Sequence, residues 1–152
     1  MSAQEYLTVS DALSMVLQGM AALPSEEVSL VDALGCVLAQ PIIAKDSLPP
    51  FANSSMDGYA IRAADVIGAD DDSPISLHVL ADIAAGTVSD IVVTEGTAAR
   101  IMTGAAMPEG ADAVVPVEDT NEPWRDDERP LPEHVLVRRS VRSGDYIRPV
   151  GE

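Results

Sequence analysis

The chain of 152 residues contains little cysteine, few aromatic residues and few basic residues. Its single cysteine excludes an internal disulfide, and we expect Cys36 to be a buried free thiol in a protein from a reducing compartment. Phe, Trp and Tyr together make up 3% of the residues, whereas 47% of all residues are hydrophobic. The composition therefore predicts a globular protein whose core consists mainly of aliphatic side chains.

Positive charge is scarce, because 9 Lys and Arg residues accompany 25 Asp and Glu residues and the formal net charge is −16. Nucleic acid and anionic membranes repel such a chain, so we exclude both as partners. The sequence has no apolar run of the roughly 20 residues that a membrane span needs, and it does not begin like a secretory signal. These absences predict a cytoplasmic protein.

Several common catalytic motifs are absent as well. The sequence has no Gly-x-Ser-x-Gly, no Gly-x-Gly-x-x-Gly and no phosphate-loop lysine motif, and Lys45 is its only lysine. The only two histidines, His78 and His134, have no cysteine or second histidine at ligand spacing, which argues against a zinc or catalytic role. The acidic residues 126–128 lack the glycine-turned loop of a cation site, and we interpret them as part of a solvated loop.

The first 46 residues show a helical pattern. Thr8 and Asp11 have the spacing of a capping box, and the apolar residues that follow predict a helix from about Val9 to Ala22. Ser29 is placed to cap a second helix that ends at Pro41, with an apolar stripe formed by Leu30, Leu34, Val37 and Leu38. We expect both stripes to face a core or a partner and to carry no chemistry.

From about residue 47 the pattern changes to short strands separated by Gly, Pro, Asp and Ser, as is typical of a small β-rich domain. The predicted strands are Met56–Arg62, Ser76–Ala85, Ala98–Met102, Ala113–Glu118 and His134–Arg138. A single helical turn is predicted at Ala63–Val66. The segments 70–74 and 119–132 are predicted to be polar loops.

Residues 47–62 combine a stiff entry with an acidic turn. Two adjacent prolines fix an extended backbone, and Asn53 and Ser54 offer short side chains that bond to nearby backbone groups. The pair Asp57-Gly58 is typical of a tight turn from which a carboxylate projects. Turn chemistry alone leaves open a plain proline-rich connector.

Two further segments contain candidate anion-binding groups. Thr103, Gly104 and Ala105 follow a predicted strand, so a hydroxyl and successive backbone N–H groups could face an anion, although loop statistics alone favour a plain strand-loop-strand unit. The guanidinium of Arg148 can bind an oxyanion or a carboxylate through two parallel hydrogen bonds. By itself, Arg148 could equally form a surface ion pair.

Three strings in these segments resemble the MoeA family, the molybdopterin molybdenumtransferases, to which the C-terminal domain of gephyrin also belongs. Residues 49–60 match Pro-Pro-Phe-x-Asn-Ser-x-Met-Asp-Gly-Tyr-Ala, and residues 100–115 match Arg-Ile-x-Thr-Gly-Ala-x-x-Pro-x-Gly-Ala-Asp-Ala-Val-Val. Residues 144–152 resemble Gly-x-Asn-Ile-Arg-x-x-Gly-Glu-Asp, with Asp145 and Tyr146 replacing the usual residues before Ile147. The family's next residue, an Asp, would follow Glu152.

The resemblance implies an α+β fold with two domains. The first would be an elongated, helix-containing domain formed by both chain ends, 1–46 and 140–152. The second would be an inserted small β-rich, barrel-like domain at 47–139. The family's later α/β and β-barrel domains have no counterpart in this sequence, so the chain resembles an N-terminal fragment.

The resemblance also implies an activity in molybdenum cofactor biosynthesis. Adenylylated molybdopterin and molybdate would react to give molybdenum cofactor and AMP, in a cleft shared by the two subunits of a homodimer. Asp57, Thr103 and Arg148 match the family's catalytic positions, and Asp57 would hold Mg²⁺ or position molybdate. Supporting or substrate-binding roles fall to Asn53, Ser54, Gly104 and Ala105.

Charge limits what this chain can do by itself. The substrates are polyanions and the chain carries a net charge of −16, so we expect it to be inactive without cations from other domains. The alternative is a non-catalytic dimerisation or interaction scaffold. The residues leave open whether a relative would handle tungstate in place of molybdate.

Overall fold

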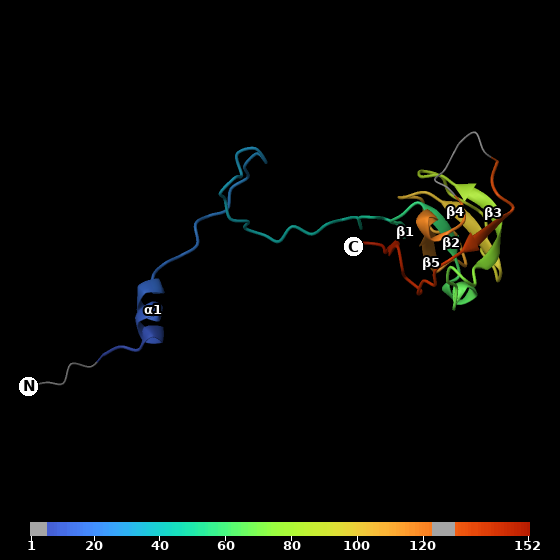
Figure 1. The fold of residues 1–152 in the computed structure, drawn as a ribbon. Coiled ribbons are helices and arrows are strands. Elements are labelled where there is room, and N and C mark those ends of the chain that lie inside the picture. The colour runs from blue at the N-terminus through green and yellow to red at the C-terminus, as the bar shows by residue number, and fades with distance from the viewer. Residues whose placement is uncertain (1–5, 123–129) are drawn as a thin grey trace, which may run out of the picture. The chain divides into compact units, whose positions relative to one another are not determined.

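The computed structural model describes residues 6–122 and 130–152, and it divides the chain into two units, Met1–Ile43 and Ala44–Glu152 (Figure 1). The acidic residues 126–128 lie outside the described residues. In the ranges that the structure describes, no helix combines the length and the apolar character that crossing a bilayer requires.

In the first unit, helix α1 (Val9–Leu17) begins as predicted. The Thr8 hydroxyl oxygen accepts a hydrogen bond from the Asp11 N–H at 3.1 Å and donates one to the Asp11 carboxylate at 2.6 Å. The helix is shorter than the expected span to Ala22 because Gly19 adopts a left-handed conformation with φ +94°. Its apolar face is exposed, and α1 has no buried residue.

The second predicted helix is absent from the structure. Ser29 accepts a hydrogen bond from the Asp32 N–H, as a cap would, but residues 30–35 form only turns, and Gly35 is left-handed with φ +88°. A short helix is stable mainly through burial of its apolar face, and here the four stripe residues Leu30, Leu34, Val37 and Leu38 are 67–96% exposed. Cys36 is also exposed, so the expectation of a buried thiol was wrong.

The second unit is built on a curled five-stranded sheet with the strand order β5-β2-β4-β3-β6 (Figure 1). Strands β3 and β4 are parallel, and the other neighbouring pairs are antiparallel. All five predicted strands are present, with ends within two residues of the prediction: β2 (Gly58–Ile61), β3 (Ile75–Ile83), β4 (Thr97–Ile101), β5 (Ala113–Pro116) and β6 (His134–Val137). The predicted turn at Ala63–Val66 is a 3₁₀ helix, and a second 3₁₀ helix, Val117–Asp119, follows β5.

The core lies on both faces of this sheet, because successive residues of a strand point to opposite sides. One face is covered by a cluster that includes Tyr59, Ile61, Leu77, Val115, Val135 and Val137. The other face is covered by a cluster of Ala60, Ile83, Val93, Ala99, Ile101, Ala105 and Val114. Apart from Tyr59, these side chains are aliphatic, as the composition predicts.

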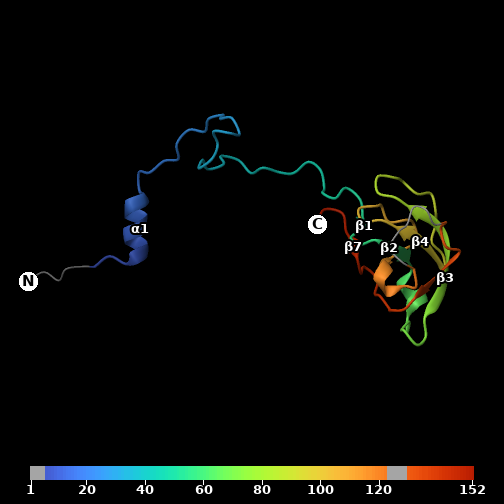
Figure 2. The same cartoon turned by 45° about the horizontal axis from the view of Figure 1, so that its top comes forward.

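A separate two-stranded sheet joins β1 (Asn53–Ser54) to β7 (Ile147–Arg148), as Figure 2 shows. The final segment belongs to the second unit: Val141 is buried in the core, and the Val114 N–H donates to the Asp145 carbonyl oxygen at 3.1 Å. The structure confirms the β-rich domain and does not show an elongated domain formed by both chain ends. A discontinuous domain of residues 1–46 and 140–152 stays a prediction.

Candidate functional site

The site is organised by Ser54, which is fully buried on β1. Its N–H donates to the Ala105 carbonyl oxygen at 3.0 Å, and its own carbonyl oxygen accepts from the Gly104 N–H at 2.8 Å. The Ser54 hydroxyl accepts from the Met56 N–H at 3.2 Å and donates to the Met56 carbonyl oxygen at 2.5 Å. Ser54 therefore fixes both the bend that leads to Asp57 and the loop that carries Thr103.

Asp57 and Thr103 are in direct contact. Oδ1 of the half-buried Asp57 accepts two hydrogen bonds from Thr103, one from its N–H at 2.7 Å and one from its hydroxyl at 2.8 Å. Among the described residues, none bonds Oδ2 of Asp57. The carboxylate thus has a fixed orientation and one oxygen available to a ligand.

The loop of Thr103, Gly104 and Ala105 supports Asp57 and β1, which corrects the expectation of backbone N–H groups facing an anion. Each of the three N–H groups already has an acceptor within the chain: Asp57 Oδ1, the Ser54 carbonyl and the Met102 carbonyl. Gly104 is left-handed, with φ +82°, and this conformation lets the loop turn back along β1. The side chain of Thr103 remains exposed.

Gly58 is required for a reason other than the predicted turn. It is the first residue of β2, and a Cβ atom at this position would lie 2.0 Å from the carbonyl oxygen of Val115 on β5. Glycine is therefore needed because two backbones approach each other closely.

Arg148 lies on β7, opposite Asn53 in the register of β1 and β7. Asn53 is buried, its side-chain amide donates to the Phe51 carbonyl oxygen at 3.3 Å, and its backbone bridges to Ala106. Strand β1 therefore separates Arg148 from the loop of Thr103. Within the described ranges, no hydrogen bond or ion pair joins the exposed Arg148 to Asp57 or Thr103, so the structure brings two of the three predicted catalytic residues together.

The comparisons with known proteins show the family of this chain. Residues 7–152 match the family model for the MoeA N-terminal region (domain I and II). The chain belongs to the MoeA family. All three strings quoted above fall within the matched residues.

Two relatives of this MoeA chain are 40% identical to it. One is molybdopterin molybdenumtransferase 2 of Mycobacterium tuberculosis, aligned over 95% of this chain and 34% of its own length, and the other is molybdopterin molybdenumtransferase of Staphylococcus aureus, with 96% and 33%. A crystal structure of the molybdopterin biosynthesis moeA protein from Pyrococcus horikoshii OT3 is 35% identical, has a TM-score of 0.79, and covers 94% of this chain and 36% of its own. The chain spans about a third of the length of these relatives.

The MoeA chain also contains a shielded ion pair across two strands that the sequence did not reveal. Arg100 on β4 is paired with Asp82 on β3, with Nη2 2.8 Å from Oδ2, and both side chains are largely shielded from solvent. Strand β2 borders β4 on the edge away from β3, and its Tyr59 is the register partner of Arg100. Arg100 opens the second string and could have been found from it, whereas Asp82 lies in a strand without any local signal.

Burial raises the pKa of Tyr59 from 10.0 to about 12. The Glu122 carboxylate raises the pKa further, Arg100 lowers it, and Asp82 raises it. The folded chain therefore keeps the Tyr59 proton at a pH at which the unfolded chain releases it.

This shift predicts a loss of stability at alkaline pH. Between pH 10 and pH 12 the folded chain binds more protons than the unfolded chain, so the free energy of unfolding falls as the pH rises. Below pH 10 the burial of protonated Tyr59 contributes its full stabilisation. As the pH rises to about 12, the free energy of unfolding should fall by roughly 3 kcal/mol. Urea unfolding at several pH values should show this decline in the natural chain and lack it in Tyr59→Phe. An identical decline in both would contradict the assignment.

Proposed function

We propose that this chain supplies the N-terminal part of the active site of a molybdopterin molybdenumtransferase, an enzyme of molybdenum cofactor biosynthesis. The reaction would take adenylylated molybdopterin and molybdate to molybdenum cofactor and AMP. The observation that carries this proposal is the carboxylate of Asp57, held at Oδ1 by the Thr103 N–H and hydroxyl. The 40% identical relatives are molybdopterin molybdenumtransferases, which supports the same reaction class.

Each proposed catalytic residue has a role that its surroundings support. Asp57 would act through Oδ2, because Oδ1 is occupied by Thr103. Thr103 holds that carboxylate in place, and its hydroxyl would donate to a molybdate or phosphate oxygen only by releasing Asp57 Oδ1, because it has a single proton. The exposed guanidinium of Arg148 would bind an oxyanion of the substrate and offset negative charge that develops there.

The carboxylate of Asp57 is a suitable ligand for Mg²⁺. Protein sites for Mg²⁺ commonly use one or two carboxylates together with phosphate oxygens of the substrate, and Asp57 offers a hard carboxylate oxygen of fixed orientation. We propose that Asp57 holds Mg²⁺ in the full-length enzyme. When bound, the ion would neutralise part of the charge of the substrate pyrophosphate.

The net charge of −16 predicts that this chain alone does not bind the substrate. Titration of adenylylated molybdopterin into the chain in a calorimeter should give no binding tighter than millimolar, because the acidic residues of this region far outnumber the basic residues that a polyanion needs. A full-length relative is the positive control and should bind under the same conditions. Micromolar binding to the chain would show that this region holds the substrate unaided.

A homodimer in the cytoplasm is part of the same proposal, on the strength of the family resemblance. The alternative is a scaffold that associates through the first unit and carries no chemistry. It is favoured by one observation, the exposure of large apolar side chains along α1 such as Leu13, Val16 and Leu17. Because the enzyme is also proposed to be a homodimer, self-association does not separate the two. Molybdenum insertion by the full-length protein does, since a scaffold would lack it.

A further inference from the structure

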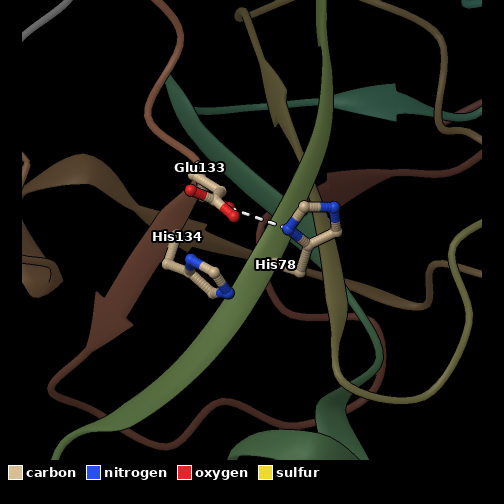
Figure 3. Close-up of side chains that lie close together, drawn as sticks. All are labelled: His78, Glu133 and His134. Atoms are coloured by element: carbon tan, nitrogen blue, oxygen red, sulfur yellow. Dashed lines mark hydrogen bonds between the residues drawn. The ribbon is translucent and has the colours of Figure 1, made fainter.

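The two histidines of the chain lie side by side on the surface of the sheet. His78 on β3 is directly opposite His134 in the antiparallel register of β3 and β6, and their ring centroids are 5.3 Å apart (Figure 3). Glu133 precedes His134, and one ring nitrogen of each histidine and a carboxylate oxygen of Glu133 all lie within 4.8 Å of one another. All three side chains are exposed.

Two imidazoles and one carboxylate form a donor set that suits Zn²⁺ and its neighbours in the first transition row. In a tetrahedral site with Zn–N distances of about 2.0–2.1 Å, two donor atoms lie roughly 3.3 Å apart. Donors within 4.8 Å of one another therefore need to approach by at most ~1.5 Å. Rotation of exposed side chains can supply that movement without any change in the sheet.

The backbone holds one of the rings in place. Nδ1 of His78 lies 3.0 Å from the carbonyl oxygen of Glu133, and Figure 3 shows this contact on the side of the ring that faces Glu133. Because a carbonyl oxygen only accepts, this nitrogen carries the proton in the ion-free chain. A metal ion bound through Nδ1 would replace that proton and break the hydrogen bond, so the ring has to turn away from the carbonyl oxygen when the ion binds.

We propose that His78, Glu133 and His134 form a binding site for a divalent ion of the late first transition row, with Zn²⁺ as the first choice. The ion would join β6, the edge strand of the five-stranded sheet, to its neighbour β3. The strongly negative chain raises the local concentration of cations around this surface. The site is independent of the proposed molybdenum chemistry.

The experiment is a zinc titration of this chain, without a histidine tag and with Cys36→Ser to remove the only thiol. Calorimetry should give one Zn²⁺ per chain. Because the chain has only two histidines, long-range ¹H–¹⁵N spectra should show which ring nitrogens bind the ion. The signals of both imidazoles should shift with zinc concentration and give the same Kd. Zinc at ~100 times its Kd should also raise Tm by ~5 °C or more.

The variants separate this site from non-specific binding. His78→Ala and His134→Ala should each weaken zinc binding at least ~tenfold, since even outer-shell partners of a metal contribute that much. Glu133→Gln should weaken it, and the matched control Glu109→Gln, at an exposed carboxylate outside the cluster, should not. Binding weaker than millimolar, a shift of only one imidazole, or unchanged affinity in His78→Ala would overturn the proposal.

Discussion

Asp57→Asn in a full-length enzyme that contains this region is expected to lower molybdenum insertion ~100-fold or more. Asparagine keeps an oxygen at Oδ1, so both hydrogen bonds from Thr103 can persist, at 2.7 and 2.8 Å in the natural chain. What the variant loses is the negative charge at Oδ2, which a cation or the reacting groups would use. The change therefore removes chemistry and preserves the local structure.

The measurement pairs molybdenum insertion by the full-length enzyme with thermal unfolding of the same protein. Tm should stay within a few degrees of the natural value, and Asp90→Asn, at an exposed aspartate outside the site, should leave both quantities unchanged. If Asp57→Asn lost activity and folding to the same extent, Asp57 would be a structural residue and the proposed site would fail.

Gly58→Ala is expected to destabilise the second unit strongly. The new Cβ would lie 2.0 Å from the Val115 carbonyl oxygen and 2.9 Å from its carbon, and both are backbone atoms that cannot rotate away. Strands β2 and β5 would have to separate along a register of four paired residues. We expect a loss of about 3 kcal/mol or more in the free energy of unfolding.

The matched control for this prediction is Gly86→Ala. Gly86 has φ +80° but open space around the added Cβ, so the substitution should cost only the strain of a left-handed alanine, about 1 kcal/mol. Urea unfolding followed by circular dichroism compares the two variants. A loss of 1 kcal/mol or less for Gly58→Ala would mean that the sheet yields at this point more easily than its packing implies.

Local patterns predicted the second unit well and the first unit poorly. The five strands were found because short apolar segments separated by Gly, Pro, Asp and Ser are a property of each segment alone. The cap at Thr8 was found for the same reason. The second helix was wrong because an apolar stripe stabilises a helix only where something buries it, and Leu34 is 96% exposed.

Within the site, the family resemblance identified two residues that are in contact, but the predicted role of the loop N–H groups was wrong. Asp57 and Thr103 were identified from two separate strings, and the structure joins them by hydrogen bonds. The expectation that successive N–H groups of this loop face an anion was wrong, because the N–H of Gly104 is bonded to the Ser54 carbonyl. Which partner satisfies a backbone group depends on strands that meet only in the folded chain.

By itself, the sequence determined the family, the aliphatic core and the strands, because each of these follows from residue type and short-range order. Only the tertiary structure decided which polar groups meet. Strand pairing placed His78 opposite His134, set Asp82 against Arg100, and made Gly58 necessary through the approach of β5. Such contacts join positions that are distant along the chain, and no local pattern records the register that brings them together.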